Sequence, residues 1–232
     1  VGTALEHLLG PGRSPAVVEY VDALTMAAIT AAAGIDLAVP SEVSAAAGAW
    51  LVVVVEAPSQ DRLDADVIDM AQALDAAGAI DTFVLEGGAG PRLIEARERA
   101  FYVAKANGAT DIVDVVVPRS SVVTYLAEVA GIAERHATFV TGCGHVGDGN
   151  VHLSVFESDP DRKRELLDDL FSAGLALGGQ ISGEHGIGSA KRDAYLRLSD
   201  PAKISLEAKI KEAFDPEGLF NPTRGGGRSD LR

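Results

Sequence analysis

The sequence predicts an α+β fold, with a mainly antiparallel sheet and helices packed on one side of it. The first observation is the order of segments in the second half, β-α-β-β-α-β, which is typical of a ferredoxin-like unit. The second is a looser repeat of this order in the first half, which leaves open a second ferredoxin-like half. The third is the pair Asp148 and Gly149 between two apolar runs, which indicates an antiparallel hairpin.

In the first half, apolar segments of two periodicities alternate. A β-branched run stopped by Pro58 has the continuous apolar pattern of a strand buried on both faces. The next segment carries apolar residues at helical spacing with acidic residues between them, and Gly78 closes it. The expected elements are a strand at 16–23, a helix at 25–34, a strand at 50–57, a helix at 61–78 and a strand at 80–86, with 35–40 as a further candidate strand.

The second half begins with a helix that has Pro91 at its start and Gly108 at its end, the expected asymmetry of helix termini. A final helix is terminated by Pro216 and Gly218, and residues 225–232 are expected to form a loose tail. The elements are a helix at 91–108, strand 111–118, helix 120–136, strands 137–145 and 150–156, helix 159–179, strand 180–182 and helix 200–214.

Charge and cysteine content narrow the classes of function. The chain has 232 residues with 34 acidic and 20 basic side chains, a net charge of -14, which disfavours binding to nucleic acid or to an anionic membrane surface. A single cysteine, Cys143, excludes an internal disulfide and favours the cytoplasm, with membrane attachment only through partners. Homo-oligomerisation is left open. Because the chain starts at Val1 rather than Met, we expect a piece of a longer polypeptide.

Two of the five histidines flank the Asp-Gly pair in GHVGDGNVH. If Asp148 and Gly149 are the central residues of a two-residue turn, His145 faces His152 across the hairpin. Directly opposed residues on one sheet face have Cβ atoms about 4.5 to 5.5 Å apart. This separation allows two imidazoles to bind one divalent cation such as zinc.

A second loop, SGEHGIG, offers the carboxylate that such a cation would need as a third protein ligand. Glu184 is the candidate, and the glycines around it allow a close approach of the backbone. The adjacent imidazole of His185 could move a proton near neutral pH. Cys143 is an alternative soft ligand, although a single buried cysteine usually behaves as a small hydrophobe.

These residues leave several classes of function open. Two histidines on a hairpin also occur for solubility or cross-strand stacking, which would suit an interaction module with no catalytic role. The same His, His and Glu set would also suit a protein that only binds metal or a metallohydrolase that needs no flavin.

Three motifs in order, GHVGDGNVH, GGQISGEHGIGSAK and AFDPEGLFNPTR, resemble the C-terminal domain of FAD-linked oxidases and dehydrogenases of the vanillyl-alcohol-oxidase type. Within this family, the chain is most similar to the group of glycolate oxidase D-subunits, D-lactate dehydrogenases and D-2-hydroxyglutarate dehydrogenases. The resemblance is strongest from about residue 91 to 224. It implies that residues 1–224 form the substrate, or cap, domain and that a separate upstream domain binds FAD, so the isolated chain should not turn over.

The resemblance also implies roles for the histidine motifs. In the metal-dependent members of the group, the residues equivalent to His145, His152 and Glu184 bind a divalent ion, usually zinc. The ion holds the carboxylate and hydroxyl of a 2-hydroxy acid and lowers the pKa of the hydroxyl. The residue equivalent to His185 accepts the proton while hydride leaves for the flavin.

The family has an arginine that grips the substrate carboxylate, and Arg97 occupies that place. The alternative is a solvated helix charge that pairs with Glu95 or Glu98. Ile94 stands where the family often has Trp, and Ile112 stands where the 2-hydroxyglutarate enzymes have a lysine for a distal carboxylate. A small or apolar 2-hydroxy acid, similar to glycolate or lactate, is therefore the expected substrate, and the electron acceptor is not indicated.

The last motif contains the asparagine that touches the flavin ring in the family. Asn221 is its equivalent here, but Thr223 and Arg224 depart from the family's Asn-Pro-Gly-Lys pattern. The alternative for Asn221 is a simple turn that ends the preceding helix.

Overall fold

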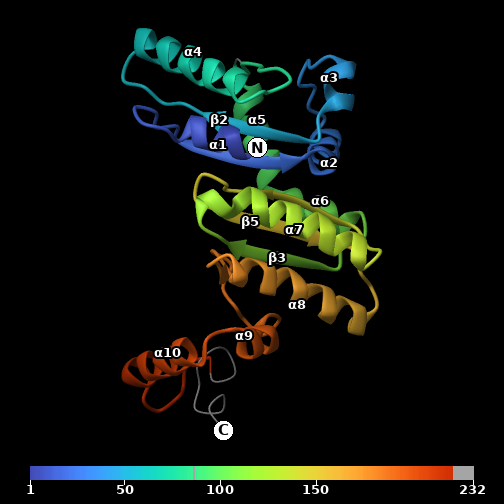
Figure 1. The fold of residues 1–232 in the computed structure, drawn as a ribbon, viewed down its shortest axis with the longest axis vertical. Helices are drawn as coiled ribbons and strands as arrows, with labels where there is room; N and C mark the ends of the chain where they lie inside the picture. Colours follow the sequence, from blue (N-terminus) through green and yellow to red (C-terminus); the bar gives the residue numbers. More distant parts are fainter. Residues whose placement is uncertain (86, 222–232) are drawn as a thin grey trace.

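The computed structural model describes residues 1–85 and 87–221 and confirms the α+β fold class. Its strands form one six-stranded sheet of order β2-β1-β4-β5-β3-β6, in which every neighbouring pair is antiparallel (Figure 1). The strands are β1 (Val17–Asp22), β2 (Ala49–Val54), β3 (Asp111–Val116), β4 (Val140–Gly144), β5 (Asn150–Val155) and β6 (Gln180–Ile181).

Helices cover the sheet and extend beyond it. They are α1 (Gly2–Leu8), α2 (Ala23–Ala33), α3 (Ser41–Ala46), α4 (Gln60–Ala76), α5 (Ala89–Glu98), α6 (Ala100–Ala106), α7 (Val122–Arg135), α8 (Pro160–Ala176), α9 (Arg192–Leu198) and α10 (Pro201–Phe214), with a 3₁₀ turn at Arg119–Ser121. The helix expected at 91–108 is interrupted at Arg99, which separates α5 from α6. The short helices α1, α3 and α9 were not expected, because six or seven residues are too few for a clear periodicity.

The second half has the predicted order β3-α7-β4-β5-α8-β6, whereas the first half adds only two strands to the same sheet. The strand expected at 80–86 is wrong: residues 80–85 are irregular, and residue 86 lies outside the described residues. Ile80 and Val84 are each 61% exposed, and Asp81 accepts a local hydrogen bond from the Thr82 backbone N–H, which competes with ladder formation. Residues 35–40 form no strand either.

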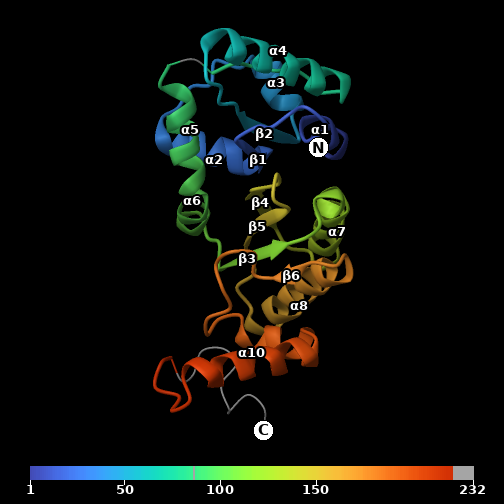
Figure 2. The same cartoon turned by 90° about the vertical axis from the view of Figure 1, so that its left-hand side faces the viewer.

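Helices pack on both faces of the sheet, not on one side as predicted. One hydrophobic core lies between the sheet and α1, α4, α7 and α8, and a second, smaller core lies between the opposite face and α2, α5 and α6 (Figure 2). The reason is that the first two strands contribute apolar side chains to both cores. In β1, for example, Val18 belongs to the larger core and Val21 to the smaller. Strands that are apolar on both faces need a cover on each.

The β-branched strand β2 was expected to be fully buried, and this was wrong. All six of its residues are only half-buried, because β2 is an edge strand of the sheet. Among the described residues, none of the helices combines the length and apolarity needed to cross a membrane.

The face covered by α2, α5 and α6 changes character along the sheet. It is apolar where Val21 of β1 and Trp50 of β2 pack together, but it is polar at β5 and β3, where His152 and Asp114 face one another in register. Both polar side chains are buried, with residue exposures of 6% and 0%. This polar part of the sheet face carries the residues that the sequence analysis singled out.

Candidate metal centre

The register of the β4–β5 hairpin differs from the predicted one. Cys143, not His145, lies opposite His152, and the Asn150 N–H donates a 3.2 Å hydrogen bond to the carbonyl of His145. The turn therefore spans residues 146–149 instead of only Asp148 and Gly149. A shift by two residues keeps both histidines on the same face, whereas a shift by one would have separated them. Their ring centroids lie 5.4 Å apart.

Glu184 reaches this pair from the loop after β6. Its Oε1 atom lies 2.9 Å from Nε2 of His152 and 3.5 Å from Nε2 of His145. One ligand atom from each of the three residues lies within 4.8 Å of the others. Two ligand atoms bound tetrahedrally to zinc lie about 3.4 Å apart, given metal–ligand distances of about 2.0 to 2.1 Å. The arrangement is thus compatible with one shared divalent cation.

A buried carboxylate from β1 orients His145. The pairing of Tyr20 with Gly144 places Glu19 beside His145, and Glu19 Oε1 is hydrogen-bonded to Nδ1 of the imidazole. This hydrogen bond raises the pKa of His145, against the effect of burial. In the neutral ring, a proton on Nδ1 that donates to Glu19 leaves Nε2 unprotonated at 3.5 Å from Glu184 Oε1, which is the tautomer a metal ligand requires.

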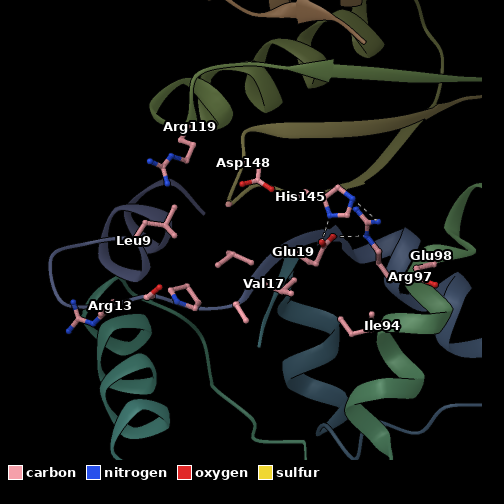
Figure 3. Close-up of a pocket in the computed structure, with 15 residues that line it drawn as sticks. Leu9, Arg13, Val17, Glu19, Ile94, Arg97, Glu98, Arg119, His145 and Asp148 are labelled. Carbon is pink, nitrogen blue, oxygen red and sulfur yellow. Dashed lines mark hydrogen bonds and ion pairs between the residues drawn. The ribbon is translucent and has the colours of Figure 1, made fainter. Parts of the chain in front are cut away.

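Arg97 completes a buried ionic group around Glu19. Its Nε atom lies 2.6 Å from Glu19 Oε2, and the two side chains are only 10% and 5% exposed. Arg97 Nη1 lies 3.5 Å from Nε2 of His145, while Nη2 is buried and has no hydrogen-bond partner within the described part of the chain (Figure 3). The guanidinium therefore has donor capacity left at the edge of the histidine cluster.

The alternative expected for Arg97, a solvated pair with Glu95 or Glu98, is not what the structure has. The ion-pair partner of Arg97 is Glu19, and Glu95 pairs with Arg99 at 2.8 Å instead.

The imidazole of His185 stacks on the ring of His152, with a centroid distance of 4.7 Å. Nε2 of His185 lies 3.5 Å from Oε1 of Glu184, and its side chain is 41% exposed. Burial, together with the positive charge of Arg97, lowers the pKa of His152 to about 3. His152 is thus held neutral, in the form that binds a metal, while His185 remains accessible to a substrate.

Without metal, the chain's stability is expected to respond to these histidines on both sides of pH 6.5, their ordinary pKa. The raised pKa of His145 gives a contribution that is complete below pH 6.5 and is lost as pH rises through its folded pKa. The lowered pKa of His152 removes stability as pH falls from 6.5 toward about 3, because the unfolded chain then binds the extra proton. The free energy of unfolding, measured with urea in the presence of a chelator from about pH 5 to pH 8, should pass through a maximum within this range. A monotonic profile that is unchanged in His152→Leu would contradict this assignment.

A cavity of about 490 Å³ adjoins the cluster at His145 and Arg97 (Figure 3). Val17 and Ile94 contribute apolar surface to its lining, which also includes the charged side chains of Arg119 and Asp148. A molecule held at the cluster therefore has a partly apolar space beside it.

Two other candidates do not join the cluster. Cys143 is 7% exposed and packs in the smaller core, and burial raises its pKa to about 11, which makes its thiol a poor ligand. Asn221 follows α10, is exposed and has a left-handed φ of 46°. Thr223, Arg224 and the tail expected at 225–232 lie outside the described residues.

Two residues that shape this site, Glu19 and Asp114, were not predicted from the sequence. Each is an acidic residue inside a buried, apolar strand, in VVEYVD and DIVDVV respectively. Acidic residues are almost never fully buried unless they are paired, so each interruption of an apolar run was a usable signal.

Comparisons with known proteins identify the family of this chain. The family model of the FAD linked oxidases, C-terminal domain, matches residues 1–224. An uncharacterized FAD-linked oxidoreductase of Mycobacterium tuberculosis is 44% identical over 222 residues, which are 96% of this chain and 48% of that protein. A D-lactate dehydrogenase of Anaerostipes hadrus is 32% identical over 191 residues, 75% of this chain and 38% of the relative.

A D-2-hydroxyglutarate dehydrogenase of Stutzerimonas stutzeri is 36% identical over 119 residues, 47% of this chain and 25% of that enzyme. The chain spans at most about half the length of these relatives. Because the family model covers nearly the whole chain, the protein belongs to the family of C-terminal domains of FAD linked oxidases.

Proposed function

We propose that this chain is the substrate-binding and catalytic-base domain of an FAD-dependent 2-hydroxy-acid dehydrogenase or oxidase. The observation that carries the proposal is the convergence of His145, His152 and Glu184 beside the accessible imidazole of His185. Relatives named as D-lactate dehydrogenase and glycolate oxidase subunit support the substrate class.

In this proposal, His145, His152 and Glu184 hold a divalent cation, most suitably zinc, because two imidazoles and one carboxylate form a frequent catalytic zinc set. A cation bound there would lower the pKa of a substrate hydroxyl as a Lewis acid. His185 accepts the hydroxyl proton at Nε2, the atom that lies 3.5 Å from Glu184. The arrangement therefore suits oxidation of the 2-hydroxyl group to an oxo group.

Arg97 is proposed to bind the substrate carboxylate. Its buried Nη2 has no hydrogen-bond partner within the described residues, and a guanidinium can grip a carboxylate with two parallel hydrogen bonds. Donors of this kind are needed because the whole chain carries a net charge of -14, which repels anions.

FAD is proposed to be held mainly by another domain of the parent polypeptide, which would be the principal partner of this chain. Flavin, when bound, accepts the hydride that leaves the α-carbon of the substrate. Asn221 is the residue proposed to contact the flavin ring, and its exposed position after α10 leaves it accessible to another domain. We propose residues 1–224 as the domain and the cytoplasm as its compartment.

The substrate is proposed to be a small or apolar 2-hydroxy acid, such as glycolate or D-lactate. Ile112 lies on β3 opposite Ser154, and neither side chain offers a positive charge to a second carboxylate. The cavity beside Arg97 has Ile94 and Val17 in its lining, which suits an apolar substituent. A metallohydrolase could use the same three ligands, but the relatives named above favour the oxidoreductase.

The proposal is tested with the full-length parent protein purified with FAD and zinc. It is expected to reduce a dye with glycolate or D-lactate, to lose this activity with a chelator and to regain it with zinc. D-2-hydroxyglutarate should be the poorer substrate. If no 2-hydroxy acid reduces the flavin in the zinc-loaded protein, the proposed function is wrong; ester or amide hydrolysis by the isolated zinc-loaded chain would favour the metallohydrolase.

A further inference from the structure

Asp114 is a charged residue in a place that disfavours charge. It lies in the middle of β3 between Val113 and Val115, and its residue exposure is 0%. It faces His152 across the sheet, yet its Oδ1 atom lies 3.9 Å from Nδ1 of that ring, beyond hydrogen-bond distance. A buried carboxylate is costly unless it is paired or hydrogen-bonded, so its partners indicate its role.

The partners of Asp114 are consecutive residues of one loop. Its Oδ1 accepts a hydrogen bond from the Gly183 N–H at 3.1 Å. Its Oδ2 accepts from the Ser182 hydroxyl at 2.8 Å, the Glu184 N–H at 3.1 Å and the His185 N–H at 2.8 Å. Burial opposes the charge, but these hydrogen bonds lower the pKa of Asp114 to about 2. The backbone carbonyl of Asp114 accepts a further 2.9 Å bond from the Ser182 N–H.

The loop needs this support because its backbone is unfavourable by itself. Ser182 has a φ of 68°, a left-handed conformation that a residue other than glycine adopts at a cost. Gly183 lies so close to Asn150 that a Cβ atom there would be 2.5 Å from the Asn150 Oδ1. The positions of Glu184 and His185 therefore depend on the contacts that hold the loop against the sheet.

Asp114 could be considered a metal ligand itself, since it forms a second cluster with His152 and His185. However, a carboxylate offers about four lone-pair sites, and the loop's hydroxyl and backbone N–H groups already use four. Coordination by Asp114 would release the loop that carries Glu184. The cluster of His145, His152 and Glu184 is the one that leaves every hydrogen bond of Asp114 intact.

We propose that Asp114 is a positioning residue, which places the carboxylate of Glu184 and the imidazole of His185 beside His152 by fixing the backbone of residues 182–185. This inference rests on the proposed function for its catalytic consequence, but not for its effect on metal binding. Fixing this loop brings the third ligand, Glu184, and the proposed base, His185, to the same site. Lys191, with its Nζ 3.9 Å from Asp114 Oδ2 and a side-chain exposure of 11%, provides a nearby compensating charge.

The test is zinc affinity of the isolated chain, measured by competition with a chromophoric chelator. Asp114→Asn replaces one acceptor oxygen by a donor that faces the loop's N–H groups. We expect zinc affinity to fall about 10- to 100-fold, the usual loss when a residue that supports a ligand is changed. The matched control is Asp111→Asn, because Asp111 lies on the same strand but bonds the Ile112 N–H and pairs with Lys163, away from the loop. Its affinity should equal that of the wild type.

Two further variants distinguish positioning from general damage. Ser182→Ala removes one of the four donors and leaves the buried carboxylate in place, so a smaller, several-fold loss is expected even if Asp114→Asn does not fold. In the parent holoenzyme saturated with zinc, Asp114→Asn should lower kcat more than it raises KM, because the proposed base is displaced while Arg97 is not. Wild-type zinc affinity in folded Asp114→Asn, or in Ser182→Ala if the first variant is unfolded, would overturn the inference. If Asp114→Asn weakens zinc binding but the wild-type parent protein oxidises no 2-hydroxy acid, only the proposed function is wrong.

Discussion

The variant His152→Ala is expected to lose zinc binding almost completely, with an affinity reduced by more than about 100-fold. His152 contributes Nε2, which lies 2.9 Å from Glu184 Oε1. Its lowered pKa of about 3 means that the ring needs no deprotonation before it binds. Removing it leaves one histidine and one carboxylate, a set too small for a tightly bound zinc. Zinc content after dialysis and chelator competition would measure the effect.

The control for this variant is His136→Ala. The imidazole of His136, which directly follows α7, pairs with Asp169 of α8 at 2.9 Å, outside the cluster, so its removal should leave zinc affinity unchanged. Stoichiometric zinc in folded His152→Ala would show that the cation, if bound, lies elsewhere. Equal losses in both variants would indicate that the measured zinc is bound at random to surface histidines.

The variant Glu19→Ala is expected to lower the free energy of unfolding by about 3 to 5 kcal/mol, the usual cost of removing one partner of a buried ion pair. Glu19 is 3% exposed and bonds both Arg97 and His145. Its loss leaves a buried guanidinium without a counter-charge and frees the imidazole to rotate. Urea unfolding of the metal-free chain, analysed by the midpoint at constant slope, would measure the change.

Two matched variants separate the buried pair from surface charge. The double variant Glu19→Leu with Arg97→Met should recover most of the lost stability, because both charges are then replaced by apolar groups of similar volume. Glu95→Ala, which breaks the exposed pair with Arg99, should cost at most about 1 kcal/mol. A loss in Glu19→Ala as small as that in Glu95→Ala would mean that Arg97 finds water or another partner.

Much of the fold could be predicted because each segment's periodicity is a local property. The β-α-β-β-α-β order of the second half is confirmed by β3 to β6 with α7 and α8. The predictions failed where a segment's environment decided its conformation. The apolar run at 80–85 has the composition of a strand, but Ile80 and Val84 remain exposed and the run joins no sheet.

The histidine pair shows how far a local pattern reaches. The predicted register opposed His145 to His152, while the structure opposes Cys143 to His152. The error of two residues left the shared face unchanged, because side chains in a strand alternate with a period of two. Convergence on one face was therefore predictable, whereas the contact distances were not.

The sequence by itself determined the alternation of strands and helices, the shared face of His145 and His152, and the motifs that carry the family resemblance, since all of these depend on residues close together in the chain. Only the tertiary structure decided that Glu19 and Asp114 are the carboxylates that orient the site. Each acts on a residue more than 70 positions away, through the pairing of strands or the packing of a loop. These partners depend on the order of strands in the sheet and on the free-energy cost of burying a charge. Neither can be read from the periodicity of a single segment.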